Sequence, residues 1–330
     1  MVANLSRPTL RHMVMETLDL QASDAGIAKA VELLSAGGLV AMPTETVYGL
    51  AADASNDTAV ARIFDAKQRP MFNPLIAHVA DMDVARRIGA FSPMAEAVAQ
   101  SFWPGALTLV LPIAPGAKLS PLVTAGLDTV AIRMPAHPVA QRLLRAFGGP
   151  LAAPSANPSG KVSPTSAAHV REGLAGRIDA IIDGGDCTVG LESTILGLDG
   201  PPRLLRPGGI PVEALEAMLG PISAQTHSDR PNAPGQLASH YAPDAAVRLE
   251  VTAPKENEIW VGFGSGCEGA ALTLSANGDL VEAAANLFRV LREADSLADC
   301  QRQIAFAPVP EHGLGRAIND RLRRASAPRP

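Results

Sequence analysis

The stretch that decides the fold of the first part of the chain is KQRPMFNPLIAH, residues 67–78. A helical pattern at 57–67 precedes it, and Pro70 disfavours helical geometry in the residue before it, so the helix is predicted to end near Arg69. The apolar run at 75–79 then predicts a half-buried strand. A helix followed at once by a strand indicates an α/β fold. The two cations suit a helix C-terminus, but they also suit an anionic ligand, and this stretch alone leaves both interpretations open.

Helix and strand signals alternate on both sides of this stretch. A helix capped by Ser23 is predicted to end at Gly37-Gly38. An Asp-Gly turn within 193–209 predicts a hairpin, and the other connections read as crossovers, so we expect a mixed sheet. Further helices are predicted at 82–89, 93–102 and 137–147, from Ser163 onward, and at 212–219, and further strands at 39–42, 106–113, 129–135, 150–157 and 179–185.

The composition is that of an ordinary globular protein, with 330 residues, 47% hydrophobic and 18% charged, and a net charge of −5. A protein that grips nucleic acid through its phosphates usually carries a basic excess, so tight nucleic-acid binding is not expected. Only the C-terminal arginines come close to a basic stripe. We interpret them as a solvated helix face: Arg316, Arg321, Arg323, Arg324 and Arg329.

The cysteines and the apolar segments bear on the location of the protein. Cys187, Cys267 and Cys300 are far apart and lack metal-ligand spacing, which favours a reducing cytosol over a disulfide framework. The N-terminal residues show no apolar core with a cleavage site, so no signal peptide is predicted. Prolines interrupt the apolar run at 102–117, which is therefore not predicted to span a membrane. We expect a cytoplasmic protein without membrane contact.

A change of composition divides the chain into domains. Residues 1–220 form the first predicted domain, which carries the helices and strands given above. Residues 221–246 are rich in Pro, Ser, Asn and Ala and have no hydrophobic period, which is typical of a linker. In residues 247–330, strands and helices alternate again and predict a smaller Rossmann-like α/β domain with an open parallel sheet.

Several common site motifs are absent or out of context. Residues 264–269, GSGCEG, match a dinucleotide-binding fingerprint, but a predicted strand follows them where the phosphate-binding helix should begin. The sequence has no GxxxxGK[ST] phosphate loop and no nucleophile elbow. It has no His-Glu-x-x-His or Cys-x-x-Cys pair either, so no metal site built from protein side chains is predicted.

Hydroxyl, amide and arginine side chains gather at the predicted strand ends. PTETVYGL (43–50) follows a strand, Arg133 lies inside an apolar strand, and residues 155–157 end another. A partly buried arginine needs an anionic partner, either from the protein or from a ligand. Ligands of α/β sheets collect at strand carboxyl ends. The pattern therefore favours a site that positions anionic small molecules and lets them react with each other.

The motifs resemble the YrdC-like family, specifically its longer two-domain members, the threonylcarbamoyl-AMP synthases. The resemblance extends from about residue 16 to 325, and it implies an open twisted mixed sheet with helices and a large concave site. It rests on PTETVYGL (43–50), Lys67-Gln68-Arg69 with NPLIAH (73–78), AIRMP (131–135), PSAN and SGKVSPT within 154–165, ESTIL (192–196), LRPGG (205–209), HYAP (240–243), LSANGDLVEAAANLFRVLREAD (274–295) and GLGRAINDRLRRA (313–325).

The resemblance implies a nucleotidyltransferase that joins L-threonine, bicarbonate and ATP into L-threonylcarbamoyl-AMP and releases pyrophosphate. This reaction is the first step of N6-threonylcarbamoyladenosine formation at tRNA position 37. The product would pass to a tRNA threonylcarbamoyl-transferase complex. Mg²⁺ is expected to accompany ATP, held mainly by phosphates and water.

Residue roles also follow from the resemblance. Arg133 is expected to face the threonine carboxylate, and Lys67 and Arg69 are expected to offset the charge that develops on the phosphates during catalysis. Tyr241 is expected to fold over the nucleotide, with the second domain acting as a lid. The threonine-binding positions are Thr46, His78, Arg133, Ser155 and Ser193 or Thr194. The ATP-binding positions are Lys67, Arg69, Asn73, Thr129, Asn157, Ser163 or Thr165, Arg206 and Tyr241.

One departure from the family pattern and two alternatives stay open. Many members carry a methionine and a basic residue in the linker where this chain has Gln236-Leu237-Ala238-Ser239, which puts a cationic linker contact in doubt. A hydrogenase-maturation carbamoyltransferase would share the first domain, but it should also carry zinc-finger cysteines and an acylphosphatase-like domain. An RNA-binding or ribosome-maturation factor with this fold should show a basic face and no ATP turnover.

Overall fold

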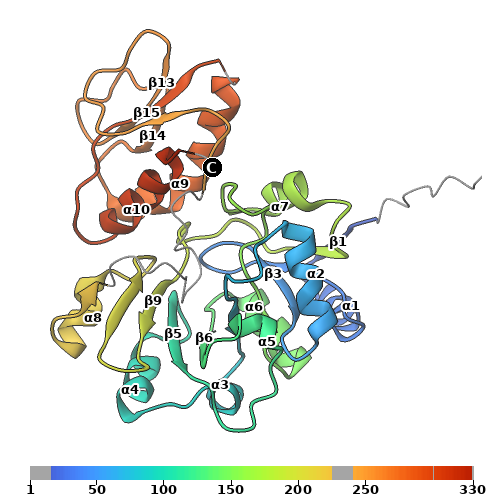
Figure 1. Cartoon of the computed structure of the whole chain (residues 1–330). Coiled ribbons are helices and arrows are strands. Elements are labelled where there is room, and N and C mark those ends of the chain that lie inside the picture. Colours follow the sequence, from blue (N-terminus) through green and yellow to red (C-terminus); the bar gives the residue numbers. More distant parts are fainter. Residues whose placement is uncertain (1–15, 225–240, 300, 329–330) are drawn as a thin grey trace, which may run out of the picture.

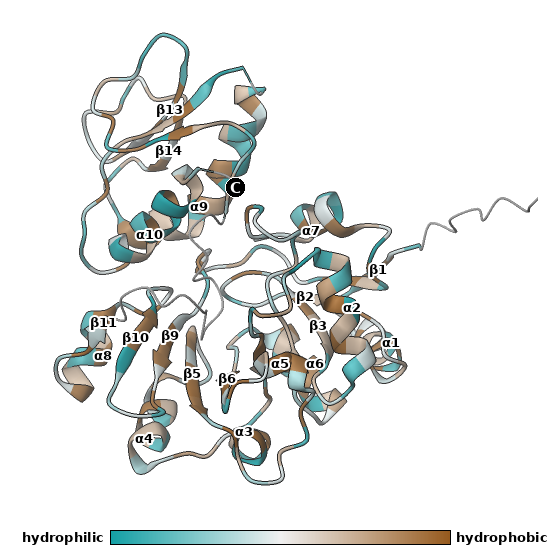
Figure 2. Ribbon diagram, viewed as in Figure 1, coloured by the Kyte–Doolittle hydropathy of each residue, from teal (hydrophilic) through white to brown (hydrophobic). Residues whose placement is uncertain are grey.

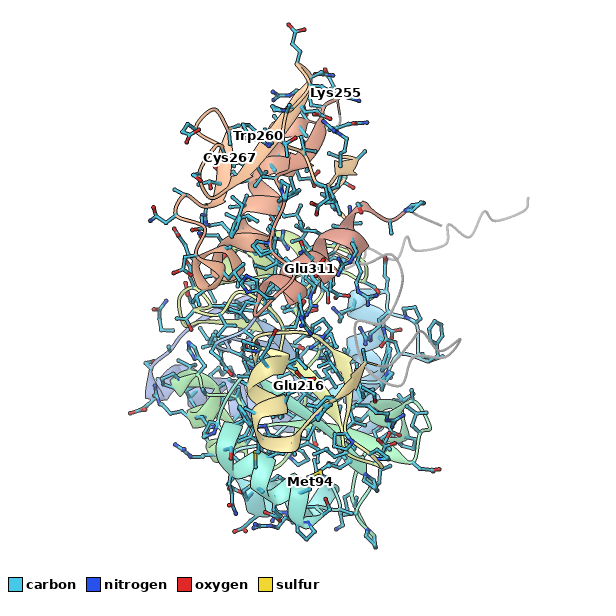
Figure 3. The ribbon with its side chains drawn as sticks, turned by 90° about the vertical axis from the view of Figure 1, so that its left-hand side faces the viewer. Met94, Glu216, Lys255, Trp260, Cys267 and Glu311 are labelled. Atoms are coloured by element: carbon cyan, nitrogen blue, oxygen red, sulfur yellow. The ribbon has the colours of Figure 1, made fainter. Side chains whose placement is uncertain are left out.

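The computed structural model describes residues 16–224, 241–299 and 301–328. These residues form two sheets, one of eleven strands and one of four, each with its own helices (Figure 1). The view from the side shows an elongated molecule, with Lys255 and Met94 near opposite ends (Figure 3). Within the described residues, no helix combines the length and the apolar character that crossing a bilayer requires.

The large sheet is mixed, as predicted, because it contains both parallel and antiparallel pairs. β4 pairs parallel with β6, whereas β5 and β6 pair antiparallel. The hairpin predicted around the Asp-Gly turn is present as β9 and β10. The strand order is β1 (Leu18–Gln21), β8 (Ala180–Asp183), β2 (Val40–Met42), β3 (Gly49–Asp53), β7 (Leu151–Ala152), β4 (Ile76–His78), β6 (Thr129–Arg133), β5 (Leu107–Pro112), β9 (Thr194–Gly197), β10 (Arg203–Arg206) and β11 (Ser223–Ala224).

Helices cover the two faces of this sheet unequally. α1 (Asp24–Ser35) and α6 (Pro138–Phe147) pack on one face, over strands β2, β7 and β8. Apolar residues of the opposite face belong to two further clusters of buried side chains. Figure 2 shows mostly apolar residues along strands β5 and β9 of this sheet. The helices that contribute to the two clusters are α2 (Asp57–Lys67), α3 (Met82–Ile88), α4 (Pro93–Phe102), α5 (Pro121–Thr124), α7 (Ala167–Leu174) and α8 (Val212–Leu219).

Local sequence signals set the helix ends. Ser23 accepts from the backbone N–H of Gly26 and begins α1, as predicted. The helix that runs into KQRPMFNPLIAH ends at Lys67, as its predicted range of 57–67 implied, and its C-cap Gln68 takes a left-handed conformation with φ 53°. The helix predicted from Ser163 begins instead at Ala167, because Ser166 provides the side-chain cap.

Strand register places the polar residues of β4 and β6 on one face of the sheet. His78 lies beside Arg133 across this parallel pair, and Ile76 lies beside Ala131 two residues earlier. Because side chains alternate between faces, all four lie on the same face. Ile76 and Ala131 belong to a small apolar cluster, and Ile76 also lines a cavity. This part of the sheet therefore forms the floor of a site.

The second sheet is parallel throughout, as predicted for residues 247–330. The glycine-rich segment 264–269 leads into a strand and not into a helix, so it lacks the helix N-terminus that a dinucleotide site requires. The strands lie in the order β12 (Val247–Arg248), β15 (Gln303–Phe306), β13 (Glu258–Phe263) and β14 (Leu272–Ser275), and the helices are α9 (Leu280–Ala298) and α10 (Gly315–Ser326).

The two parts of the chain share an apolar contact. Val47 and Leu191 belong to the same buried cluster as Leu287 and Phe288 of α9. Gly190 has φ 70°, and a Cβ atom there would lie 2.5 Å from the carbonyl oxygen of Ala284. Only glycine suits both the backbone conformation and the close approach of α9. The second part therefore packs directly on the loops of the first.

Some elements escaped prediction or differ from it. β1 and β3 were not predicted, and the strand expected at 150–157 shrinks to the two residues of β7. β11 pairs with β10, which places Ser223–Ala224 in the large sheet. The rest of the predicted linker up to residue 240, including Gln236–Ser239, lies outside the described residues. The domain boundaries at 220 and 246 stay predictions.

Candidate functional site

A cavity of about 50 Å³ opens above the polar strand ends. Its wall combines segments that are far apart in the sequence: the turn after β2, strands β4 and β6, the segment after β7, the hairpin β9–β10, and Tyr241. The lining residues are Thr44, Thr46, Val47, Gly49, Arg69, Ile76, His78, Arg133, Ala153, Pro154, Ser155, Glu192, Ser193, Arg206 and Tyr241.

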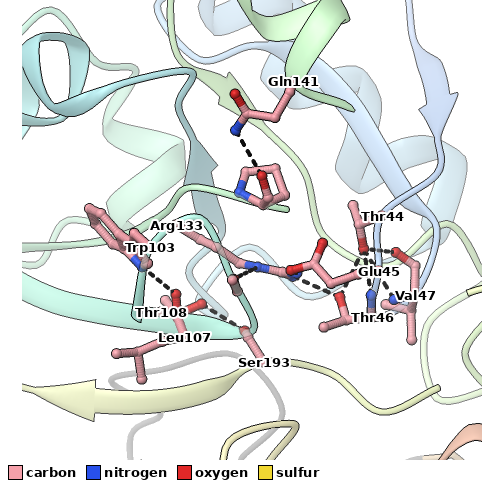
Figure 4. Close-up of polar contacts among 12 residues, drawn as sticks. Thr44, Glu45, Thr46, Val47, Trp103, Leu107, Thr108, Arg133, Gln141 and Ser193 are labelled. Atoms are coloured by element: carbon pink, nitrogen blue, oxygen red, sulfur yellow. Dashed lines mark hydrogen bonds and ion pairs between the residues drawn. The ribbon is translucent and has the colours of Figure 1, made fainter. Parts of the chain in front are cut away.

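The turn after β2 is organised by the hydroxyl of Thr44. This oxygen accepts from the backbone N–H groups of Thr46 and Val47, and the hydroxyl donates to the Val47 carbonyl at 2.6 Å. These bonds fix the backbone of a segment that would otherwise leave buried donors unsatisfied. They also hold the Thr46 side chain toward Arg133, whose Nη1 donates to Thr46 Oγ1 at 2.7 Å (Figure 4).

Arg133 is the central cation of this half of the cavity. Its Nη2 donates to Glu45 Oε1 at 2.6 Å, and its Nε donates to the carbonyl of Gly105 at 3.1 Å. Only 3% of the residue is exposed. Burial alone would raise the pKa of Glu45, but the Arg133 guanidinium outweighs this effect and the pKa lies below its ordinary value. Glu45 therefore stays ionised, and its ion pair holds the Arg133 guanidinium in place.

His78 is neutral in this environment. It is 3% exposed, and its Nδ1 lies 3.3 Å from the carbonyl oxygen of Ile76. Burial, followed by the neighbouring Arg133 charge, lowers the pKa of His78 to about 3. The imidazole therefore presents a hydrogen-bonding group, and not a positive charge, to any ligand in the cavity.

Ser193 connects the cavity to strand β5. Its Oγ lies 2.7 Å from Oγ1 of Thr108, which is fully buried. Arg206 approaches from β10, and its Nη2 donates to the Ser193 carbonyl at 2.9 Å. Figure 4 shows Thr108 and Ser193 below the Arg133 side chain. Ser193 thus lies between the Arg133 half of the cavity and a second group of arginines.

Arg69 and Arg206 form this second group. Arg69 donates to the carbonyls of Asn73 and Pro74, which are neutral. Burial is the main cause that lowers the pKa of both guanidinium groups, that of Arg69 to about 10, and the charge of Arg206 contributes to the effect on Arg69. An anionic ligand would offset this desolvation. These two residues are the strongest candidates for a phosphate contact.

Lys67 and Asn73 are buried but do not line the cavity. Lys67 Nζ donates to the carbonyl of Ser155 at 2.6 Å and also to that of Asn157, and burial places its pKa well below the ordinary value. Asn73 is 1% exposed, and neither its Nδ2 nor its Oδ1 has a hydrogen-bond partner within the described part of the protein. Lys67 therefore holds the 155–157 loop, and Asn73 keeps its amide available.

The remaining predicted residues serve local structure or lie apart. Asn157 Nδ2 donates to the carbonyls of Pro158 and Lys161, and Thr194 Oγ1 donates to the carbonyl of Ile210. Thr129 begins β6, four residues before Arg133, which separates the two by about 13 Å along a strand. Seven predicted residues thus lie outside the cavity wall: Lys67, Asn73, Thr129, Asn157, Ser163, Thr165 and Thr194.

Tyr241, from the predicted linker, lines the cavity. Its φ is 62°, it is 1% exposed, and its ring stacks on Phe288 of α9 with centroids 5.4 Å apart. Burial, together with the charge of Glu192, raises the pKa of Tyr241 to about 12, so the phenol keeps its proton at neutral pH.

Sequence reasoning missed Glu45, Glu192 and Arg321. The two glutamates occur inside quoted motifs, PTETVYGL and ESTIL, but the predictions gave them no role. Arg321 was interpreted as part of a solvated helix face, which is wrong because it is 1% exposed and ion-paired with Glu192. The description does hold for Arg323, whose side chain is 57% exposed.

Comparison with known proteins gives matches over both parts of the chain. Residues 32–208 match the family model Sua5_yciO_yrdC, described as "Telomere recombination", and residues 210–327 match one described as "Threonylcarbamoyl-AMP synthase, C-terminal domain". A Bacillus subtilis protein named threonylcarbamoyl-AMP synthase is 42% identical, over 97% of this chain and 99% of that protein. A Pyrococcus abyssi protein of the same name is 44% identical, over 90% and 93%.

A solved structure resembles the whole arrangement. The crystal structure of P. abyssi Sua5 complexed with L-threonine superimposes with a TM-score of 0.85 at 41% sequence identity. The superposition covers 94% of this chain and 97% of that one. The likeness therefore includes both sheets and the contact between them.

Proposed function

The chain belongs to the Sua5/YrdC family of threonylcarbamoyl-AMP synthases, and from this premise we propose that it joins L-threonine, bicarbonate and ATP into L-threonylcarbamoyl-AMP with release of pyrophosphate. The reaction would make the protein a nucleotidyltransferase. One observation supports this best: a single cavity is lined by two chemically different sets of cations. Arg133 is ion-paired with Glu45, whereas Arg69 and Arg206 donate to backbone carbonyls, and Arg206 also lies in the field of the Glu192 carboxylate.

The Arg133 half suits an amino acid. A threonine carboxylate would share the Arg133 guanidinium with Glu45, while His78, Ser155 and Ser193 provide neutral hydrogen-bonding groups nearby. Because His78 is uncharged, it does not draw the threonine carboxylate away from Arg133. The neutral threonine amine would attack bicarbonate and form a carbamate with loss of water, or attack CO₂ derived from bicarbonate with loss of a proton.

The Arg69–Arg206 half suits the phosphates of ATP. A carbamate oxygen would attack the α-phosphate, the bond to the β-phosphate oxygen would break, and pyrophosphate would leave. Fixed guanidinium groups stabilise charge that develops during such a transfer, and the loss of one contact of this kind costs about 3–4 kcal/mol. Lys67 Nζ already donates to the carbonyls of Ser155 and Asn157, so any phosphate contact would add to these two bonds.

Mg²⁺ would accompany ATP. The two glutamates at the cavity, Glu45 and Glu192, are each ion-paired with an arginine. Among the described side chains, no group of three or more His, Cys, Asp or Glu residues could hold a metal. The ion would therefore depend on phosphate and water oxygens, as Mg²⁺ commonly does in nucleotide sites.

The product would pass to a tRNA threonylcarbamoyl-transferase complex, for modification of tRNA position 37, and the chain itself would not bind nucleic acid tightly. Its exposed C-terminal arginines support this: Arg316 and Arg323 are paired with Glu213 and Glu311 and so offer little net positive charge. An RNA-binding factor would need a basic face in their place.

An assay of pyrophosphate release tests the proposed reaction. The protein is incubated with ATP, Mg²⁺ and bicarbonate, with and without L-threonine. Release that depends on threonine supports the proposal. Release at the same rate without threonine would contradict it.

A further inference from the structure

The C-terminal domain inserts one charged side chain into the first domain. Arg321 of α10 is separated from Glu192 by 129 residues, yet its Nε donates to Glu192 Oε2 at 2.9 Å. Its Nη1 donates to the carbonyl of Pro207 at 2.9 Å. Arg321 is 1% exposed, and it is among the largest fully buried side chains of the described residues.

Arg321 contacts two residues of the cavity wall. Glu192 lines the cavity, and its other oxygen, Oε1, accepts from Ser163 Oγ at 2.6 Å. Tyr241 also lines the cavity, and the guanidinium carbon of Arg321 lies 5.4 Å from the centre of its ring. A cation over an aromatic face is attractive, more so where water is excluded. One guanidinium thus fixes a carboxylate and a phenol that come from different segments.

The groups that face Glu192 are cationic or neutral donors. Arg321 approaches from α10, Arg206 from β10, and Ser163 from the loop before α7. Burial alone would raise the pKa of Glu192, but the two arginines outweigh it and the pKa lies at about 2. Arg321 is also ion-paired with Asp320, whose Oδ2 lies 2.7 Å from Nη1 of Arg321.

We propose that Arg321 is a positioning residue for the ATP half of the site, which holds Glu192 and Tyr241 so that they and Arg206 keep the arrangement that the nucleotide meets. The inference rests on the proposed function, because it takes these residues to surround ATP. It makes the second domain part of the nucleotide site and not merely a lid. The threonine half depends on Glu45 instead, so the effect should be confined to ATP.

The test uses the full chain with Arg321→Met, Arg321→Lys and the control Arg323→Met. Arg323 lies on the same helix and is paired with Glu311 at the surface. ATP and L-threonine affinities are measured separately by calorimetry, beside thermal unfolding. We expect Arg321→Met to weaken ATP binding at least about tenfold, or 1.4 kcal/mol, and to change threonine binding less than about twofold. Arg321→Lys should recover part of the loss, and the control should match the wild type.

A pH series separates positioning from general destabilisation. Without Arg321 the pKa of Glu192 rises, so the Arg321→Met variant should lose further ATP affinity as the pH is lowered from about 8 to about 5. The wild type should show only the pH dependence that titration of the ATP phosphates imposes on every variant, because Arg321 keeps Glu192 ionised throughout. The double variant Glu192→Gln/Arg321→Met has no carboxylate to titrate at position 192 and should show no more than that common dependence.

Should Arg321→Met fail to fold, the double variant Glu192→Gln/Arg321→Met removes both buried charges and serves in its place, with the same expected loss of ATP affinity. Unchanged ATP binding in these variants, or equal losses for ATP and threonine, would overturn the inference. A wild type that binds ATP and responds to Arg321→Met as described, but releases no threonine-dependent pyrophosphate, would refute the proposed function and leave the role of Arg321 standing.

Discussion

Arg133 and Glu45 form a buried ion pair, with Nη2 of the arginine 2.6 Å from Oε1 of the glutamate, on the face of the sheet that forms the cavity floor. Buried charges are stable only when they are paired and hydrogen-bonded. The pair therefore keeps a guanidinium available in the absence of a ligand, and a threonine carboxylate would share it with Glu45. Under the proposed function, the site for the amino acid would be largely preformed.

Replacement of Arg133 by alanine should remove the threonine contact. We expect Arg133→Ala to weaken threonine binding by about 1.5–3 kcal/mol, the usual range for a hydrogen bond to a charged group, with little change in ATP binding. Calorimetric titration with each substrate measures this. Arg142→Ala is the matched control, since Arg142 pairs with Asp24 at the surface and its side chain is 39% exposed. An unchanged threonine affinity in Arg133→Ala would remove the assignment.

Replacement of Lys67 should affect both substrates. Its ammonium group bonds the carbonyls of Ser155 and Asn157, so Lys67→Met leaves two buried acceptors without a donor, at about 1–3 kcal/mol for each unsatisfied group. If Lys67 only offset charge on the phosphates, as the resemblance implies, its loss would lower adenylate formation far more than stability. The carbonyl contacts indicate that stability and threonine affinity should fall too. Urea unfolding and threonine titration measure these two effects. A variant that loses only ATP affinity would instead support a direct contact between Lys67 and a phosphate.

His78 should make the folded state sensitive to acid. Burial lowers its pKa in the folded protein to about 3, below the ordinary value near 6.5, so between these values the unfolded chain binds more protons at this residue. Its contribution to stability is present above about pH 6.5 and is lost as the pH falls toward 3, at about 1.4 kcal/mol per pH unit. Urea unfolding at several pH values should show a smaller slope for His78→Gln than for the wild type. Equal slopes would contradict the neutral, buried imidazole.

Gly190 tests whether the contact between the two domains supports activity. A methyl group there would meet the backbone of α9, whereas at Gly116, which has a similar φ of 76°, it would meet open space. Gly190→Ala should therefore lower the melting temperature and the turnover number more than Gly116→Ala, which reports the cost of the backbone conformation alone. Equal effects of the two substitutions would show that the approach of α9 is unimportant.

Local signals were enough to predict much of the fold but not the contacts between distant segments. Ser23 predicts the start of a helix, and Pro70 predicts the end of another. The Asp-Gly turn predicts the hairpin. β3 has the sequence GLAAD, which is poor in β-branched residues, and its extended structure depends on pairing with β2 and β7. No local pattern reports such pairing.

The residues of the candidate site also differ in whether the local sequence could predict them. Arg133 could be singled out because a charged residue stands out in an apolar strand, whereas a role for His78 followed only from the family resemblance. The ion pair between Glu192 and Arg321 could not, since it joins an acid and a base 129 residues apart and each looks like an ordinary surface charge in its own segment. Its role emerges only when α10 packs on the first domain.

The fate of the bicarbonate carbon tests the central claim most directly. The protein is incubated with ATP, Mg²⁺, L-threonine and isotopically labelled bicarbonate, and the nucleotide products are separated and identified by mass spectrometry. The account predicts an adenylate that contains both threonine and the labelled carbon, formed in step with pyrophosphate. A nucleotide product without the label, or label that never enters a nucleotide while ATP is consumed, would contradict it.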